Sequence, residues 1–242
     1  MVSPKGEIDT RPRRFYTDVA IMQEPGGWTV KLDSRLLRTP EKHPLLLPTG
    51  KLAGIIADEW RRQAERIDLL SMFNTRLANV AIDRAPQTRT ELAAEVARYT
   101  QTDLVCHLAD NPAALRARQE AAWAPLRAWA EKELGVRLVA VEGIMPVAQP
   151  RQSAEAARAH AAALDDWRLT ALVHAIALLG SAILGLAVER RRITAAEAFE
   201  TSRIDETFQA EKWGEDAEAA RFANRVRAEA RALDDWFDAL KA

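Results

Sequence analysis

Residues 169–188 read LTALVHAIALLGSAILGLAV, and no other stretch of the chain constrains the architecture as strongly. The run is apolar apart from one threonine, one histidine, one serine and two glycines. About 20 apolar residues can cross a bilayer, but a helix that is apolar on every side is also typical of the centre of a bundle. Because this run contains a histidine and lies between long charged segments, we expect one buried central helix and no stable membrane insertion.

The segments before and after this run follow a helical period. Thr49 is the expected N-cap of a helix whose apolar face includes Ile56 and Trp60. Gly135 is expected to end a helix that opens after Pro112. Capping boxes are predicted at Thr88 with Glu91 and at Thr194 with Glu197. Further helices are predicted over residues 153–164, 195–213 and 215–240, with a strand or loop over 136–141.

The first fifty residues show a different pattern, which is typical of short antiparallel strands. A strand is predicted over residues 14–23, followed by the turn residues Pro25, Gly26 and Gly27. Residues 28–32 alternate between apolar and polar, and Asp33 with Ser34 can close a tight hairpin onto residues 36–39. The fold class is therefore α+β, with a small N-terminal antiparallel β domain over 12–50 and a larger all-helical domain over 51–242.

Composition narrows the class of partner and the compartment. The 34 basic and 35 acidic residues leave a net charge of −1, whereas nucleic-acid binders usually carry a basic excess, so we expect no nucleic-acid partner. The single cysteine, Cys106, fits a reducing compartment. Residues 1–10 lack the apolar core of a secretory signal. We expect a soluble, cytoplasmic monomer.

Recognisable catalytic patterns are missing from the sequence. The glycines form neither a dinucleotide-binding fingerprint nor a phosphate-binding loop, and the four histidines have no zinc spacing. We therefore expect no catalytic residue, no metal and no cofactor. Adjacent carboxylates such as Asp165 with Asp166 keep one alternative open, which is a small-molecule hydrolase that uses paired carboxylates.

One predicted helix carries an unusual mixture of side chains. Projecting residues 195–213 onto a helix places Phe199, Glu206, Gln209 and Trp213 on one stripe, together with Ser202. A lone buried carboxylate is costly unless it is paired. Glu206 therefore forms a buried salt bridge, for which Arg221 and Arg225 are candidates, or it is an interface acid that receives a cation from a partner.

Two further residues are candidates for contact with a partner. Trp60 lies on the core side of its helix, so it either packs in the core or touches a partner. Asp216 follows Trp213 and Gly214 at the start of the last helix. The predicted partner-binding residues are Glu206, Phe199, Gln209, Trp213, Asp216 and Trp60.

An ordered series of short motifs resembles a known family. The motifs are Arg14-Phe15-Tyr16, Val30-Lys31-Leu32-Asp33-Ser34-Arg35, Ile56-Ala57-Asp58-Glu59-Trp60, Thr102-Asp103-Leu104, Gln119 with Trp123, Asp205-Glu206 with Gln209, and Trp213-Gly214-Glu215-Asp216. Together they resemble the ATP synthase assembly chaperones that hold the alpha subunit of the catalytic head.

This resemblance covers roughly residues 12–236 and implies a β domain, a helical domain, no catalysis and no cofactor. It also implies that the chain binds the free alpha subunit and prevents its aggregation until the beta subunit replaces it. Eukaryotic relatives of this kind act in the mitochondrial matrix. An acidic residue of the late helical region matters in the family, and Glu206 is the matching candidate. The sequence departs from the expected pattern at Met72-Phe73-Asn74.

Overall fold

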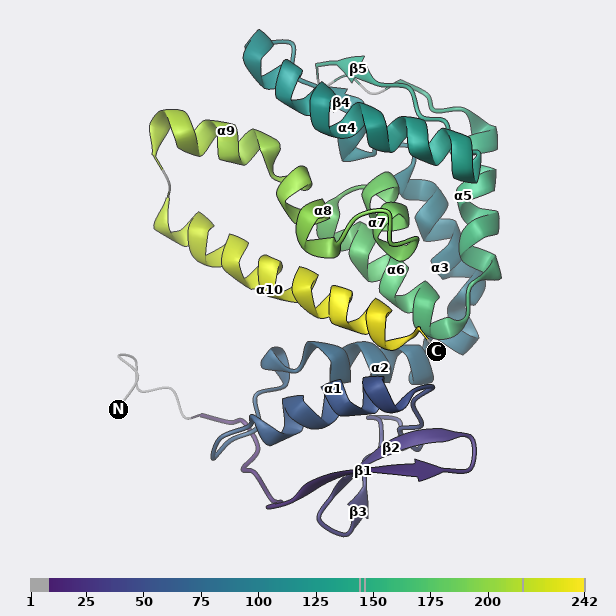
Figure 1. The fold of residues 1–242 in the computed structure, drawn as a ribbon, viewed down its shortest axis with the longest axis vertical. Helices are drawn as coiled ribbons and strands as arrows, with labels where there is room; N and C mark the ends of the chain where they lie inside the picture. The colour runs from purple at the N-terminus through teal and green to yellow at the C-terminus, as the bar shows by residue number, and fades with distance from the viewer. Residues whose placement is uncertain (1–8, 144, 146, 215, 242) are drawn as a thin grey trace. The chain divides into compact units, whose positions relative to one another are not determined.

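The computed structural model describes residues 9–143, 145, 147–214 and 216–241 (Figure 1). By close contacts the chain divides into unit one, which ends at Asn79, and unit two, which runs from Val80 to Lys241. Unit one contains a three-stranded antiparallel sheet, and unit two is mainly helical. The predicted fold class, a small N-terminal sheet followed by a larger helical region, is confirmed.

The sheet of unit one is built from two tight hairpins. Its strands, in spatial order, are β1 (Val19–Glu24), β2 (Gly27–Leu32) and β3 (Arg35–Leu36). Glycine is required where β2 begins, directly after the first turn, because a Cβ on Gly27 would lie 2.6 Å from the carbonyl oxygen of Leu47. Asp33 and Ser34 form the second turn, as predicted, and Asp33 adopts a positive φ of 53°.

The first strand begins later than predicted, at Val19 rather than at Arg14. The backbone of Arg14 donates to the carbonyl of Glu65, and its guanidinium donates to the carbonyl of Gln63 at 2.6 Å. Arg14 is therefore tied to the segment that follows the first helix and lies outside the sheet. The backbones of Thr17 and Asp18 instead donate to the carboxylate of Asp33 in the second turn.

Helix α1 (Gly50–Arg61) packs on this sheet and contributes Leu52, Ala53, Ile56, Ala57 and Trp60 to the core of unit one. It begins at Thr49, as predicted, and the Thr49 hydroxyl accepts a hydrogen bond from the backbone of Leu52 at 3.1 Å. The face that packs on β1 and β2 consists of fully buried apolar residues, among them Leu52 and Ile56.

A buried carboxylate of α1 fixes the start of the next helix, α2 (Phe73–Asp83), which follows the short 3₁₀ turn η1 (Leu69–Ser71). One oxygen of Glu59 accepts from the backbone and side-chain nitrogens of Asn74 at 2.7 and 3.0 Å. The other oxygen accepts from the backbone and hydroxyl of Thr75 at 2.8 and 2.7 Å. A negative charge at a helix N-terminus is stabilising, so these four bonds anchor α2 to α1.

Unit two is a helical assembly with one small pair of parallel strands. The strands are β4 (His107–Leu108), which follows the 3₁₀ turn η2 (Leu104–Cys106), and β5 (Val141–Glu142). The helices are α3 (Ala85–Tyr99), α4 (Ala113–Leu134), α5 (Arg151–Ala163), α6 (Asp166–Leu179), α7 (Ala182–Glu189), α8 (Ala195–Ser202), α9 (Ile204–Trp213) and α10 (Ala217–Ala239). Glu215, the expected first residue of the last helix, lies outside the described residues.

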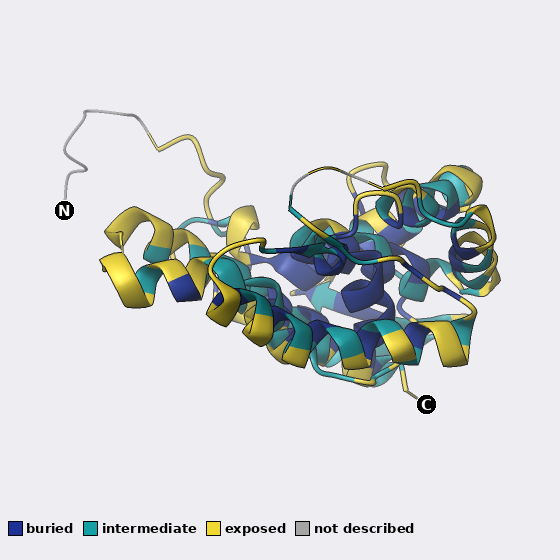
Figure 2. Cartoon of the chain, turned by 90° about the horizontal axis from the view of Figure 1, so that it is seen from above, coloured by how far each residue is buried: buried dark blue, intermediate teal, exposed yellow. Residues whose placement is uncertain are grey.

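The apolar run 169–188 forms two helices, so the prediction of a single central helix is wrong. Helix α6 ends at Gly180, whose φ of 66° is left-handed, and Ser181 caps α7 by accepting from the backbone of Leu184. A Cβ on Gly185 would lie 2.3 Å from Cγ1 of Ile176, so the two helices touch closely at this glycine. Every residue of α7 is buried, whereas α6 combines buried residues with half-buried ones and the exposed Ala177. Figure 2 shows the buried residues of the chain in dark blue. In the part of the chain that the structure describes, no helix is long and apolar enough to span a membrane.

The other predicted helix ends have mixed outcomes. Gly135 ends α4 with a φ of 68°, and Thr194 forms a complete capping box with Glu197. The capping box predicted at Thr88 is wrong, because α3 already begins at Ala85. Thr88 lies at a kink inside α3, where its hydroxyl donates to the carbonyl oxygen of Arg84.

Candidate partner-binding site

The predicted stripe over residues 195–213 is interrupted, which corrects the expectation of one continuous helix. Helix α8 ends and α9 begins at Arg203, whose φ of −106° and ψ of 17° are not helical. Phe199 therefore belongs to α8, whereas Gln209 and Trp213 belong to α9. At this joint the chain leaves the core of unit two and turns toward α4.

One face of α9 is held against α4. Gln119 of α4 donates to the carboxylate of Asp205 at 2.6 Å, and Arg118 pairs with Glu211 at 2.7 Å. The ring of Phe208 is 5% exposed, with the guanidinium of Arg118 5.1 Å from its centre. Because these contacts occupy one face, the remaining faces of α9 are available to line a groove.

Arg227 ties the middle of helix α10 to Glu200 of α8 at 2.7 Å, and the buried side chains of α10 lie in its C-terminal part. Leu233, Trp236 and Phe237 are buried there, whereas residues 217–229 contain exposed and half-buried side chains. Asp216 caps the free end by accepting from the backbones of Glu218 and Ala219 at 3.0 and 2.8 Å. Figure 1 shows α9 and the N-terminal half of α10 as two arms.

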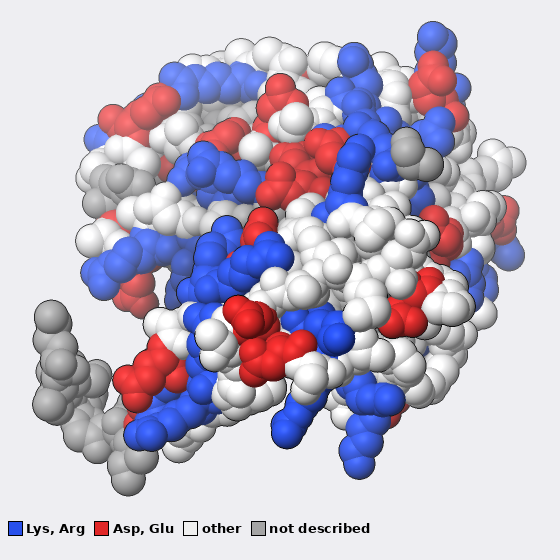
Figure 3. All heavy atoms as spheres, turned by 60° about the horizontal axis from the view of Figure 1, so that its bottom comes forward, with Lys and Arg blue, Asp and Glu red and all other residues white. Residues whose placement is uncertain are grey.

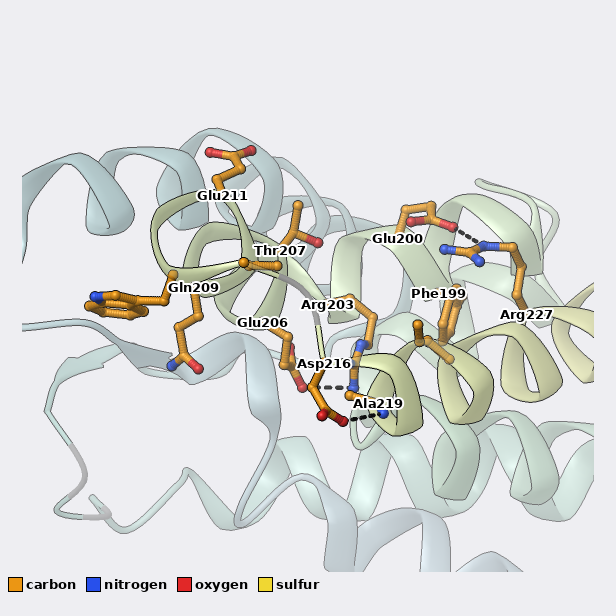
Figure 4. A pocket seen from close by; sticks show the side chains of 15 residues that line it. Phe199, Glu200, Arg203, Glu206, Thr207, Gln209, Glu211, Asp216, Ala219 and Arg227 are labelled. Atoms are coloured by element: carbon orange, nitrogen blue, oxygen red, sulfur yellow. Dashed lines mark hydrogen bonds and ion pairs between the residues drawn. The ribbon is translucent and has the colours of Figure 1, made fainter.

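A groove of about 700 Å³ separates these arms, and we call it the α9–α10 groove (Figure 4). Its walls carry several small side chains, which are Ala210, Ala219, Ala220 and Ala223. Its charged residues are the carboxylates Glu200, Glu206, Glu211 and Asp216 and the guanidiniums Arg203 and Arg227. Trp213 supplies its exposed aromatic surface, and the buried ring of Phe199 also belongs to the lining.

The two interpretations of Glu206 can now be compared with its surroundings. Its side chain is 47% exposed, so the expected buried salt bridge to Arg221 or Arg225 is wrong. Glu206 instead pairs with Arg203, one helical turn earlier, at 2.9 Å. Exposed pairs of this kind typically contribute about 0–1 kcal/mol, so Glu206 can exchange Arg203 for another cation at low cost.

Five of the six predicted partner-binding residues line the α9–α10 groove. Glu206 and Asp216 extend into it from opposite walls, and Gln209 lies on the α9 wall (Figure 4). Phe199 is 2% exposed, with the guanidinium of Arg227 5.2 Å from its ring centre. Trp213 is 77% exposed at the end of α9. Whether any of these residues touches a partner remains a prediction.

The sixth residue, Trp60, lies in unit one and is 7% exposed. Its ring packs edge-on against Tyr16 at a centroid distance of 5.6 Å, and the Tyr16 hydroxyl donates to the Trp60 carbonyl at 2.7 Å. The side chain is therefore part of the core of unit one.

Sequence reasoning missed Arg203, Arg227 and the three alanines of α10 as groove residues. The spacing of Ala219, Ala220 and Ala223, which places them on one face of α10, is the signal that could have revealed that wall. The two arginines gave no local signal, because their role depends on the joint between α8 and α9. On the face shown in Figure 3, positive and negative side chains are interspersed among large uncharged areas.

Comparison with known proteins identifies similar chains. Residues 13–131 match the family model described as ATP12 chaperone protein. The crystal structure of Atp12 from Paracoccus denitrificans is 45% identical, covers 95% of this chain and 99% of its own, and has a TM-score of 0.87. An aspartate-to-lysine mutant of that protein gives 45% identity, 94% and 97% coverage and a TM-score of 0.86. A candidate chaperone from Agrobacterium tumefaciens is 38% identical, with 95% and 87% coverage and a TM-score of 0.89.

Proposed function

The chain belongs to the ATP12 chaperone family, and on this basis we propose that it binds the free alpha subunit of the catalytic head of an ATP synthase. In this proposal the chain prevents aggregation of the alpha subunit until the beta subunit replaces it. It acts in the cytoplasm as a monomer, without catalysis and without a cofactor.

The observation that carries this proposal is the combination of an exposed indole with charged groups on the α9–α10 groove. A subunit that awaits assembly exposes an apolar interface, and such patches drive aggregation. Trp213, with 77% of its surface exposed, offers apolar area to cover that interface. The charged rim keeps the contact partly polar, which suits a complex that must later dissociate.

Within the groove, we propose Glu206 as the principal charged contact. It is exposed, it lies on the α9 wall, and its partner Arg203 belongs to the same chain segment. A cation of the alpha subunit can therefore replace Arg203 without leaving a buried charge behind.

The experiment that tests this function is aggregation of purified alpha subunit, followed by light scattering with and without the chain. We expect the chain to suppress scattering, and we expect Glu206→Lys to lose most of this suppression while its thermal midpoint changes by less than about 2 °C. Glu218→Lys is the matched control, because Glu218 is an exposed acid of α10 outside the groove lining. Failure of the well-folded wild-type chain to suppress scattering would refute the proposal.

A further inference from the structure

We propose that the α9–α10 groove binds one amphipathic α-helix of the alpha subunit, and that this helix places a lysine or arginine between Glu206 and Asp216. This inference rests on the proposed function and adds the secondary structure and charge of the segment that is bound. It follows from the walls of the groove, its small side chains and its charge.

The nature of the walls favours a helix over an extended peptide. Both walls are α-helices, α9 and the N-terminal half of α10, so their backbone groups are already paired within each helix. An extended segment in the groove would find no sheet edge with which to pair its own N–H and C=O groups. A helix satisfies these groups internally and needs only side-chain contacts from the walls.

The small side chains of α10 permit close helix packing. Ala219 and Ala223 are four residues apart and Ala220 lies beside them, so one face of α10 is nearly flat. Helix axes pack about 8–10 Å apart, and small side chains at the contact allow the lower end of that range. Helix α9, with ten residues, is about 15 Å long, which corresponds to about three turns of a bound helix.

The charge of the groove specifies a basic segment. Its lining holds four carboxylates and two guanidiniums, and Arg118, which lies outside the lining, pairs with Glu211, so one negative charge is left in excess. Glu206 forms an ion pair with the guanidinium of Arg203. In Asp216, one oxygen, Oδ1, accepts both capping hydrogen bonds. A lysine or arginine of the bound helix would meet both carboxylates, which extend from opposite walls (Figure 4).

Trp213 provides the apolar part of the α9–α10 groove. It is the last residue of α9 and lines the groove with 77% of its surface exposed. The bound helix therefore needs an apolar side chain on the face that carries its cation, at a spacing of three or four residues. An amphipathic helix with a basic position has this pattern.

Site-directed photocrosslinking tests which segment enters the groove. A photoreactive phenylalanine replaces Thr207, an exposed residue of the α9 wall, and is irradiated with purified alpha subunit. We expect the crosslinked peptide to come from a segment that is helical in the alpha subunit and carries a lysine or arginine. The same group at Ala228, which is exposed on α10 and outside the groove lining, is the control and should give little product. Crosslinks to a strand, a loop or an acidic segment would overturn the inference.

Filling the groove gives an independent measurement. Ala223→Leu adds bulk to the α10 wall, whereas Ala228→Leu adds the same bulk outside the groove lining. We expect Ala223→Leu to weaken binding of the alpha subunit about tenfold or more and Ala228→Leu to leave it within about twofold. Equal thermal midpoints show that both variants are folded.

Removing the two negative charges tests the expected cation. Asp216→Asn retains a good capping side chain, so the double variant Glu206→Gln/Asp216→Asn loses charge without losing the start of α10. We expect the double variant to bind the alpha subunit about tenfold more weakly than wild type. Added salt should reduce the affinity of the double variant less than it reduces the affinity of wild type. Glu218→Gln, the control, should bind as wild type does.

The outcomes separate this inference from the proposed function. If wild-type chain suppresses aggregation but the Ala223→Leu and double variants suppress it equally well, the groove inference is wrong and the function stands. If wild-type chain does not suppress aggregation, the function fails and the inference fails with it.

Discussion

Gln119 and Asp205 form a hydrogen bond of 2.6 Å that ties α9 to α4 across 86 positions of the sequence. Gln119 is completely buried, and its other side-chain atom, Oε1, accepts from the backbone of Ala109 at 2.7 Å. Asp205 precedes Glu206, so this contact sets the direction in which Glu206 leaves α9. The groove wall is therefore positioned by a residue that does not itself line the groove.

We predict that Asp205→Ala loosens α9 without unfolding unit two. The variant loses one charge-assisted hydrogen bond, and the buried Gln119 amide is left without that acceptor, at a cost of about 1–3 kcal/mol. Backbone amide exchange of residues 204–213 should become faster, whereas exchange in the buried helix α7 should not change. Unaltered exchange in α9 would show that Phe208 and Arg118 hold this helix without Asp205.

We predict that Gly185→Ala destabilises unit two, because the new methyl group would meet Ile176 at 2.3 Å. Overpacking of this kind costs about 1–3 kcal/mol, which urea unfolding can measure. Gly54→Ala is the control, since a Cβ there would only approach Cδ1 of Ile21 at 3.9 Å. An unchanged unfolding midpoint for Gly185→Ala would contradict the close contact between α6 and α7.

We predict that Glu59→Gln lowers the free energy of unfolding by about 2–4 kcal/mol. The substitution keeps the shape but sets an amide group against the hydrogen-bond donors of Asn74 and Thr75. The measurement is urea unfolding followed by circular dichroism. Glu65→Gln, at an exposed position nearby, should change the free energy by less than about 0.5 kcal/mol.

A pH dependence of stability follows from Asp103, whose carboxylate accepts from the backbones of Val105 and Ile183 at 3.1 and 3.0 Å. Burial raises the pKa of Asp103 to about 6 from 3.8, because it outweighs the hydrogen bonds that lower the pKa. The folded state then binds more protons than the unfolded state between these values. This contribution to stability is full below about pH 4 and is lost as the pH rises through 6.

We therefore predict that the wild-type chain loses up to about 3 kcal/mol from this group between pH 4 and pH 7, relative to Asp103→Asn. The comparison with Asp103→Asn is needed because other carboxylates titrate in the same range. Urea unfolding at several pH values gives the difference. If wild type instead gained stability over the variant as the pH rises, the hydrogen bonds to Val105 and Ile183 would outweigh burial.

Local signals in the sequence predicted much of the secondary structure. Thr49 and Thr194 cap helices as expected, because a capping bond joins residues two or three positions apart and needs no distant partner. Asp33 and Ser34 close the second hairpin for the same reason. Thr88 carried an equally clear local signal, but the chain had already entered α3 at Ala85, so the signal was overridden.

The sequence predicted several residues of the candidate site but not the groove that they line. The expected stripe contained four residues of the groove lining, Phe199, Glu206, Gln209 and Trp213, although it assumed one helix where the structure has two. The opposite wall comes from α10, and helical periodicity does not state which helices face one another. Trp60 was also predicted to contact a partner, but its side chain lies in the core of unit one.

The sequence itself determines the order of the elements, the fold class and most helix and strand positions. The reason is that hydrophobic periodicity and helix-capping bonds act between residues only a few positions apart. The division of the run 169–188 between α6 and α7 depends on tertiary structure. Asp103 reaches the backbone of Ile183 across 80 positions, and Gly185 allows α7 to pack on Ile176. The α9–α10 groove is likewise a tertiary feature, because contacts with α4 direct one wall and the buried end of α10 directs the other.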